Sequence, residues 1–167
     1  NLMRALKKAA SLALMGFDVD GVLTDGTLYF GPGGDELKAF SSLDGHGIKL
    51  LRQTGIEVAI ISGRQSRALE LRAQNLGVTE LHMAVDDKLG CLRTLLSQRG
   101  LGLAQAGYMG DDVVDLEILT ACGFSATVAD GHPDVRRHVD FVSGLGGGKG
   151  GVGEVWDLLL KAGGKFA

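Results

Sequence analysis

Residues 12–25 read LALMGFDVDGVLTD and carry the strongest pattern in the chain. An apolar run over residues 12–17 ends abruptly at Asp18, and a second carboxylate, Asp20, follows two residues later. A short apolar run with such a break is typical of a strand buried on both faces of a sheet. Isolated charges are costly to bury, so we expect these acids to meet a cation, a partner or a substrate. The simpler interpretation is a turn with two solvated aspartates, but the GVLTD sequence that follows argues against it.

The composition is that of an ordinary globular chain. Of its 167 residues, 45% are hydrophobic and 22% are charged, so we expect one domain over residues 1–167. The formal net charge of -3 provides no basic field for nucleic acid, so an anionic substrate must be met by local cations. No apolar run approaches the roughly 18 residues of a membrane helix, and we therefore expect neither a nucleic-acid nor a membrane partner.

The cysteines and the first residues bear on the compartment. Cys91 and Cys122 stand alone without a CxxC pair, which is typical of buried thiols in a reducing compartment. Lys7 and Lys8 precede the first apolar run and so imitate a signal peptide, but the aspartate pair follows where a small-residue cleavage site belongs. We expect this run to be the first strand and the protein to be cytoplasmic.

Strands and helices alternate along the rest of the chain. Helices are expected at residues 48–54, 66–76, 87–98, 113–121, 133–137 and 152–161, and further strands at 57–61, 79–83, 106–109, 124–129 and 141–143. A β-hairpin is predicted within residues 26–41, from strands at 27–30 and 36–41 around a GPGGD turn. The alternation predicts an α/β fold with a doubly wound, mostly parallel, Rossmann-like sheet and helices on both faces.

Three polar motifs fall at the ends of predicted strands. Asp18 follows the first strand, Ser62 follows the strand at 57–61 within IISGR, and Asp111 follows the strand at 106–109 within GDDVVD. Ligands of doubly wound sheets bind at the carboxyl ends of the strands. Each later motif has an ordinary alternative: a plain strand-turn serine, or aspartates favoured by the dipole of a helix N-terminus. Taken with the first aspartate pair, the acidic run indicates a site for a hard cation such as Mg²⁺.

DVDGVLTDG, residues 18–26, resembles the first motif of the haloacid dehalogenase (HAD) phosphatase superfamily, DxDGxxT. Its spelling is most similar to the 3-deoxy-D-manno-octulosonate 8-phosphate phosphatase family. SGR at 62–64 resembles the second motif, Lys88 the third and GDDVVD the fourth, so the resemblance covers residues 18–115. It implies a Mg²⁺-dependent hydrolase of a sugar acid phosphate in lipopolysaccharide biosynthesis. Because no long insertion interrupts the pattern, it also implies a HAD-like fold without a separate cap domain.

The resemblance implies roles for the catalytic residues. Asp18 is the nucleophile that forms a phosphoaspartate, and Asp20 is the general acid and then the base that activates water. Ser62, beside the Gly63 amide, binds the phosphoryl oxygen, and Lys88 is the cation on the transferring group. An aspartate suits this task because it is already ionised at neutral pH.

The resemblance also implies a metal site. Mg²⁺ is held by the Asp18 carboxylate, the Asp20 backbone carbonyl and the Asp111 carboxylate, with Asp112 acting through water. Asp115, four residues after Asp111, can orient a neighbour such as the lysine of the third motif.

Further cations are expected around the substrate, because the family's substrate carries a carboxylate as well as a phosphate. By resemblance the substrate-binding residues are Asp20, Ser41, Ser42, Leu43, Asp44, Gly45, Lys49, Ser62, Gly63, Arg64, Arg72 and Lys88. Solvated helix-surface charges are the ordinary alternative for the outer cations. Leu43 stands where many relatives carry Arg, and His46 stands where others have Tyr.

The hairpin and the glycine-rich segment at residues 144–153 complete the resemblance. The family's hairpin helps to build a homotetramer, so we expect neighbouring subunits to cover the site. The glycine-rich segment imitates a P-loop, but Ser143 stands where the first glycine belongs and Gly150 replaces the Ser/Thr. It resembles the family's GGxGAxRE segment instead, with Gly153 in place of the arginine, and we expect a flexible tail that reaches an adjacent active site.

Three alternatives stay open on the sequence. A phosphatase for a nine-carbon sugar acid 9-phosphate is the nearest, and a catalytically idle HAD domain serving assembly is another. A receiver-type phosphoacceptor domain also uses clustered aspartates. Intact Asp18, Asp20, Ser62, Lys88 and Asp111 argue against idleness, and DxDGxxT with the hairpin argues against a receiver domain.

Overall fold

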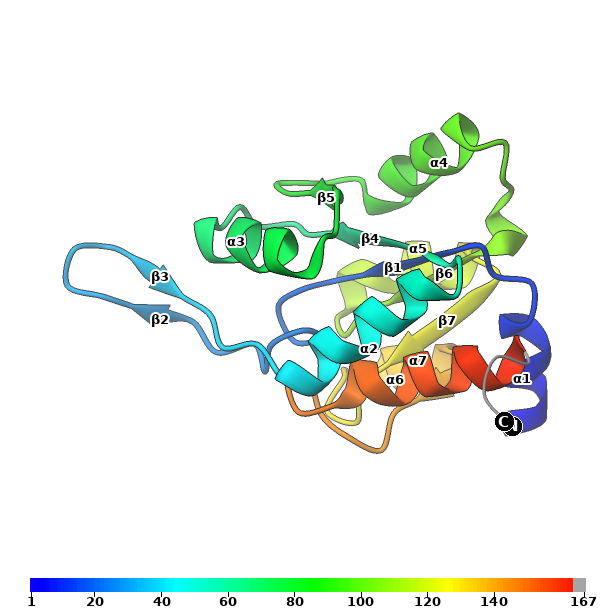
Figure 1. The fold of residues 1–167 in the computed structure, drawn as a ribbon. Coiled ribbons are helices and arrows are strands. Elements are labelled where there is room, and N and C mark those ends of the chain that lie inside the picture. Colours follow the sequence, from blue (N-terminus) through cyan, green and yellow to red (C-terminus); the bar gives the residue numbers. More distant parts are fainter. Residues whose placement is uncertain (164–167) are drawn as a thin grey trace.

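The computed structural model describes residues 1–163, which fold around one six-stranded sheet (Figure 1). All neighbouring strands pair in parallel, in the order β5-β4-β1-β6-β7-β8. The strands are β1 (Leu14–Phe17), β4 (Glu57–Ile61), β5 (Glu80–His82), β6 (Ala106–Met109), β7 (Phe124–Thr127) and β8 (Phe141–Val142). The predicted doubly wound α/β fold is confirmed, with β1 in the interior of the sheet.

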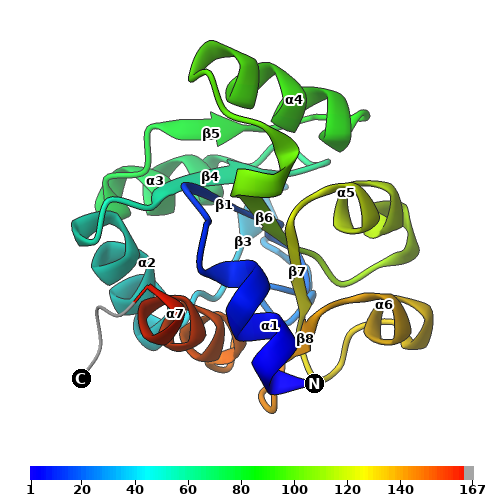
Figure 2. The same cartoon turned by 90° about the vertical axis from the view of Figure 1, so that its right-hand side faces the viewer.

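Helices cover both faces of the sheet (Figure 2). They are α1 (Leu2–Ala9), α2 (Ser42–Gln53), α3 (Arg67–Leu76), α4 (Lys88–Gln98), α5 (Leu116–Ala121), α6 (Pro133–His138) and α7 (Gly151–Ala162), with 3₁₀ turns η1 (Leu103–Gln105) and η2 (Val113–Asp115). Among the described residues, no helix is long and apolar enough to cross a membrane.

Each face of the sheet has its own hydrophobic core. Side chains of a strand alternate between the two faces. Phe17 of β1 and Ile60 of β4 therefore pack with α1, α2, α3 and α7, whereas Leu14 and Ile61 pack with α4, α5 and α6. The central strands are buried on both sides, and this explains why their sequences are continuous apolar runs.

The predicted hairpin is present and projects from the core (Figure 1). Its strands, β2 (Tyr29–Phe30) and β3 (Glu36–Leu37), are antiparallel and pair only with each other. They are shorter than the predicted 27–30 and 36–41, because an isolated two-stranded ribbon has little packing to extend it. Phe30 is 65% exposed and Leu37 is 62% exposed.

Two differences from the predicted elements are helix α1, which was not predicted, and helix α2, which begins at Ser42 rather than at residue 48. Ser41 caps the helix, since its hydroxyl accepts the backbone N–H groups of Leu43 and Asp44. Two glycines inside the helix allow close packing: a Cβ on Gly45 would lie 2.3 Å from an Arg72 nitrogen, and one on Gly47 would lie 1.6 Å from a Trp156 nitrogen.

Candidate active site

Parallel pairing brings the ends of three strands together. Phe17, the last residue of β1, lies in register with Ile60 on one side and Met109 on the other. The residues that follow these strand ends include Asp18, Ser62 and Asp111, as predicted from the motif positions. Residues far apart in the sequence thus meet at one edge of the sheet.

A cluster of three carboxylates lies at this edge. Oxygens of Asp18, Asp111 and Asp115 lie within 4.8 Å of one another. The Lys88 ammonium, from the first residue of α4, lies 3.2 Å from Asp18 Oδ1 and donates to Asp115 Oδ1 at 2.7 Å. Asp115 Oδ2 also accepts the backbone N–H groups of Asp111 and Asp112. Asp115 is fully buried, and it therefore orients both the lysine and the acidic loop.

The cluster holds more negative charge than Lys88 balances. Burial and the neighbouring Asp115 charge raise the pKa of Asp18 to about 6. Burial and the Asp18 charge raise the pKa of Asp111 to about 8. These raised pKa values indicate that nearby positive charge does not fully neutralise the ionised carboxylates of Asp18 and Asp111. A divalent cation would supply the missing positive charge. Because all donors are oxygens, the set fits a hard ion such as Mg²⁺.

The loop after β1 leaves room for Asp111. Gly21 has a φ of +88°, and a Cβ at this position would lie 1.8 Å from Asp111 Oδ2. A side chain here would therefore displace the carboxylate. The loop is held by Thr24, whose hydroxyl accepts the backbone N–H groups of Gly21 and Gly26. The close approach of Asp111 thus explains the glycine of the DxDGxxT pattern, and the hydrogen bonds that hold the loop explain the threonine.

The glycine-rich segment packs on this same loop. The Gly148 backbone N–H donates to the Val22 carbonyl at 3.1 Å, and a Cβ on Gly147 would lie 2.0 Å from the Gly21 carbonyl oxygen. Residues of this segment therefore contact the first loop of their own chain, and the reach of a flexible tail to an adjacent active site stays a prediction. Only glycine permits two backbones to approach this closely.

Asp20 lies outside the carboxylate cluster. Its Oδ1 accepts from the Lys38 ammonium at 2.6 Å, and its Oδ2 lies 3.6 Å from Nε of Arg64. Arg64 belongs to the second motif and was predicted to contact substrate, but nothing in the sequence pattern singles out Lys38. Lys38 directly follows β3. Its contact with Asp20 depends on the hairpin folding back onto the first loop, which the sequence does not predict.

Ser62 and Asp112 occupy the loops on either side of Asp18. The Ser62 side chain is buried, and its hydroxyl accepts the Arg64 backbone N–H at 3.2 Å. Gly63 beside it is exposed. Asp112 is exposed and its carboxylate accepts the Val113 backbone N–H.

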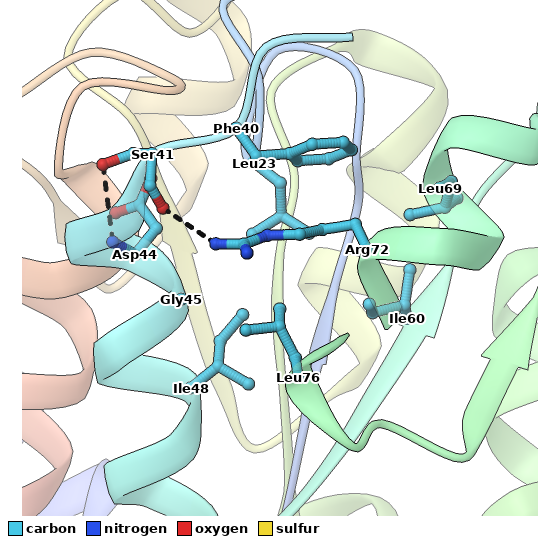
Figure 3. Close-up of a pocket in the computed structure, with 10 residues that line it drawn as sticks. All are labelled: Leu23, Phe40, Ser41, Asp44, Gly45, Ile48, Ile60, Leu69, Arg72 and Leu76. Carbon is cyan, nitrogen blue, oxygen red and sulfur yellow. Dashed lines mark hydrogen bonds between the residues drawn. The ribbon is translucent and has the colours of Figure 1, made fainter. Parts of the chain in front are cut away.

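The remaining predicted substrate residues fall into separate groups. Figure 3 shows Ser41, Asp44, Gly45 and Arg72 around one small pocket, where Leu23 adjoins from the first loop. Arg72 lies over the Phe40 ring and donates to the Ser41 carbonyl at 3.3 Å. The structure thus brings these four residues together in one pocket, which the first loop also lines.

Other predicted substrate residues lie outside this pocket. Lys49 is exposed and lines a different hollow with Arg52 and Gln74. Ser42 and Leu43 are exposed on the first turn of α2.

The fold and the clustered aspartates define a class of protein, the hydrolases of the HAD superfamily. A solved structure from Legionella pneumophila assigned to HAD subfamily III A matches with a TM-score of 0.95 and 36% identity, covering 98% of this chain and 90% of that one. No model of a known protein family matches the chain.

Sequence relatives narrow the class to one family. The 3-deoxy-D-manno-octulosonate 8-phosphate phosphatase of Escherichia coli (strain K12) is 42% identical over 161 residues, covering 96% of this chain and 86% of the relative. The same phosphatase from Moraxella catarrhalis, solved in complex with magnesium ion, phosphate ion and a KDO molecule, matches with a TM-score of 0.97 and 38% identity, covering 99% of this chain and 95% of that one. The chain belongs to the 3-deoxy-D-manno-octulosonate 8-phosphate phosphatase family.

Proposed function

We propose that this protein hydrolyses 3-deoxy-D-manno-octulosonate 8-phosphate to 3-deoxy-D-manno-octulosonate and phosphate in lipopolysaccharide biosynthesis, with Mg²⁺ as its cofactor. The observation that carries the proposal is the cluster of Asp18, Asp111 and Asp115, in which Lys88 contacts Asp18 and Asp115. Membership of the family and the magnesium, phosphate and KDO of the Moraxella catarrhalis structure support the substrate and the metal.

In the first step, an oxygen of the Asp18 carboxylate attacks the phosphorus atom. The bond between phosphorus and the sugar oxygen breaks, and the leaving oxygen takes a proton from Asp20. The products of this step are the free sugar acid and a phosphoaspartate on Asp18. Positioning a carboxylate nucleophile divides one difficult hydrolysis into two easier steps.

In the second step, Asp20 accepts a proton from a water molecule whose oxygen attacks the phosphorus. The bond between phosphorus and Asp18 breaks, which releases phosphate and restores the carboxylate. Asp20 is then protonated again and ready for the next turnover.

The surrounding groups neutralise charge on the phosphoryl group. Lys88 lies beside Asp18 and carries a positive charge, and Ser62 and the Gly63 amide follow β4 at the same edge of the sheet. When bound, Mg²⁺ would be held by Asp18, Asp111 and the Asp20 backbone carbonyl, and would supply the positive charge that lets two anions meet. Asp112 would act on it through water.

We further propose that Lys49, Arg64 and Arg72, with residues 41–45, meet the sugar acid, and that four copies assemble through the hairpin. The exposed Phe30 and Leu37 support the assembly, because large apolar side chains on a projecting ribbon favour burial against another protein surface. A cytoplasmic location belongs to the same proposal and is supported by the free thiols of Cys91 and Cys122. We treat residues 1–167 as one phosphatase domain, of which residues 164–167 lie outside the described part.

Phosphate release from eight-carbon and nine-carbon sugar acid phosphates, with Mg²⁺ and with a chelator, tests the function. We expect turnover of the eight-carbon substrate that the chelator abolishes. Asp18→Asn should lower kcat by at least about 10³-fold, because the nucleophile is lost. Preference for the nine-carbon substrate would favour the alternative phosphatase, and inactivity on both would favour an idle assembly domain.

A further inference from the structure

Lys38 is a buried cation at the base of the hairpin. Its side chain is 1% exposed, and its ammonium lies 2.6 Å from Asp20 Oδ1 and 3.0 Å from Glu36 Oε1. A buried ammonium is costly unless it is paired, so these two contacts fix where its charge lies. Lys38 thereby connects the hairpin to the first catalytic loop.

Asp20 meets a second cation on its other oxygen. Arg64 Nε lies 3.6 Å from Asp20 Oδ2, and the same guanidinium lies 3.3 Å from Glu36 Oε1. Asp20 is thus held between two cations that share one further carboxylate. A carboxylate held at both oxygens has little freedom to rotate.

The two buried lysines of this region serve different carboxylates. Lys88 faces Asp18 and Asp115 within the carboxylate cluster, whereas Lys38 faces Asp20 outside it. Lys88 is therefore placed to act on the phosphoryl group. Lys38 is placed to act on the group that exchanges protons with the leaving oxygen and water.

We propose that Lys38 is a positioning residue that holds the Asp20 carboxylate in the geometry for proton transfer to the leaving group. This inference rests on the proposed function, since it requires Asp20 to be the general acid. Proton transfer needs heavy atoms within hydrogen-bond reach, and a misplacement of about 1 Å costs about 10²-fold in rate. A hairpin lysine therefore contributes to catalysis without contacting the substrate.

The leaving group distinguishes this role from simple anchoring of the hairpin. A sugar alkoxide leaves poorly without a proton, whereas the nitrophenolate of p-nitrophenyl phosphate leaves well without one. The ratio kcat/KM reports only the steps up to phosphoaspartate formation, provided that this step is irreversible. A displaced general acid should therefore lower kcat/KM for the sugar phosphate much more than for the nitrophenyl ester.

The test compares Lys38→Met, which keeps the length and removes the charge, with the wild type on both substrates. We expect a loss of about 10²-fold in kcat/KM on the sugar phosphate, the lower end of a general-acid contribution of about 10²–10⁴. The value of kcat/KM for the nitrophenyl ester should stay close to that of the wild type. The loss should fall mainly in kcat, and Lys38→Arg should recover most of it. Glu36→Gln, which leaves the Lys38–Asp20 pair in place, should show a much smaller loss.

Each other outcome has a definite meaning. Equal losses in kcat/KM on the two substrates, or a Glu36→Gln loss equal to that of Lys38→Met, would make Lys38 a structural anchor and overturn the inference. If Lys38→Met does not fold, Lys38→Gln on the same two substrates gives the same answer. A wild-type protein that hydrolyses neither ester would overturn the proposed function instead, so the two failures are distinguishable.

Discussion

The carboxylate cluster and the β2–β3 hairpin are joined through Asp20, yet they are built in opposite ways. In the cluster, Asp18, Asp115 and Lys88 are mostly or fully buried, and the Lys88 ammonium lies within 3.2 Å of both carboxylates. In the hairpin, Phe30 and Leu37 are exposed, and the buried side chain is the cation Lys38 at its base. The side chains of the cluster are thus held by partners within the same chain. The apolar side chains of Phe30 and Leu37 on the hairpin are instead left exposed.

This difference separates two requirements of a phosphatase. The chemical groups must be held within fractions of an ångström, and a sheet edge with buried partners provides this. An apolar ribbon in water has no such support and favours contact with another surface. Changes in the cluster should therefore reduce turnover or stability, whereas changes on the hairpin should alter assembly.

After the loss of the nucleophile itself, the largest effect is expected from Lys88→Met in the cluster. Removing the ammonium leaves the phosphoryl group and Asp18 without their nearest cation, so kcat/KM should fall by about 10²–10³-fold. Phosphate release under saturating Mg²⁺ measures it. Lys7→Met, an exposed lysine of α1, is the matched control and should be neutral. A similar loss in both variants would show that the cluster has no special need of its lysine.

Gly147→Ala should destabilise the support of the first loop. The added Cβ would lie 2.0 Å from the Gly21 carbonyl oxygen, so one of the two backbones must move. We expect the free energy of unfolding to fall by about 3 kcal/mol, the cost of an overpacked site. Gly102→Ala adds its Cβ in open space and should change stability by less than about 0.5 kcal/mol. Urea unfolding measures the free energy of unfolding of both variants. Equal values would mean that Gly147 does not pack tightly against the first loop.

Metal binding should stabilise the protein more at high pH than at low pH. The pKa values of Asp18 and Asp111, about 6 and about 8, lie above the unfolded value. The metal-free fold therefore holds protons that the unfolded chain has released, and its stability falls as pH rises from about 4 to about 8. Mg²⁺ replaces those protons, so the increase in Tm on adding it should be larger at about pH 8.5 than at about pH 5.5.

Asp111→Asn provides the control for this pH dependence. It removes the group with the higher pKa of the pair and one predicted ligand, so most of the Mg²⁺-dependent increase should disappear. An increase in Tm that is equal at both pH values in the wild type would contradict a metal bound by these carboxylates.

Ala84→Gly should stabilise the loop that leads to Lys88. Ala84 has a φ of +55°, a left-handed conformation that costs a non-glycine residue about 1 kcal/mol. The hairpin turn also has a residue with positive φ, Gly34 at +88°, and there it is a glycine. Ala84→Gly should therefore raise the free energy of unfolding by about 1 kcal/mol, and Gly34→Ala should lower it by a similar amount. Thermal unfolding of both variants measures the contrast, and a destabilised Ala84→Gly variant would contradict it.

The smallest effect on folding is expected from Phe30→Ser on the hairpin. The side chain is 65% exposed, so the free energy of unfolding should change by less than about 0.5 kcal/mol. The mass in solution should nevertheless fall from that of the proposed tetramer. Sedimentation of the wild type and the variant measures this, and a wild type that sediments as a monomer would remove the assembly from the proposal.

Local patterns predicted much of the fold. The strands predicted at 57–61 and 106–109 coincide with β4 and β6, because a buried parallel strand is a short apolar run with clear ends. The meeting of Asp18 with Asp111 was also predictable, since parallel strands bring their carboxyl ends to one edge of the sheet.

Contacts between distant segments decided the rest. Helix α2 extends through Gly45 and Gly47 because Arg72 and Trp156 fill the space that their side chains would take. The pairing of Lys38 with Asp20 and the docking of Gly147 on Gly21 depend on which loops the fold places side by side. By itself, the sequence determined the strands, the acidic motifs and the class of chemistry, because these follow from neighbouring residues. Only the tertiary structure decided which cation holds each aspartate, because a side chain's partner depends on distances that folding creates.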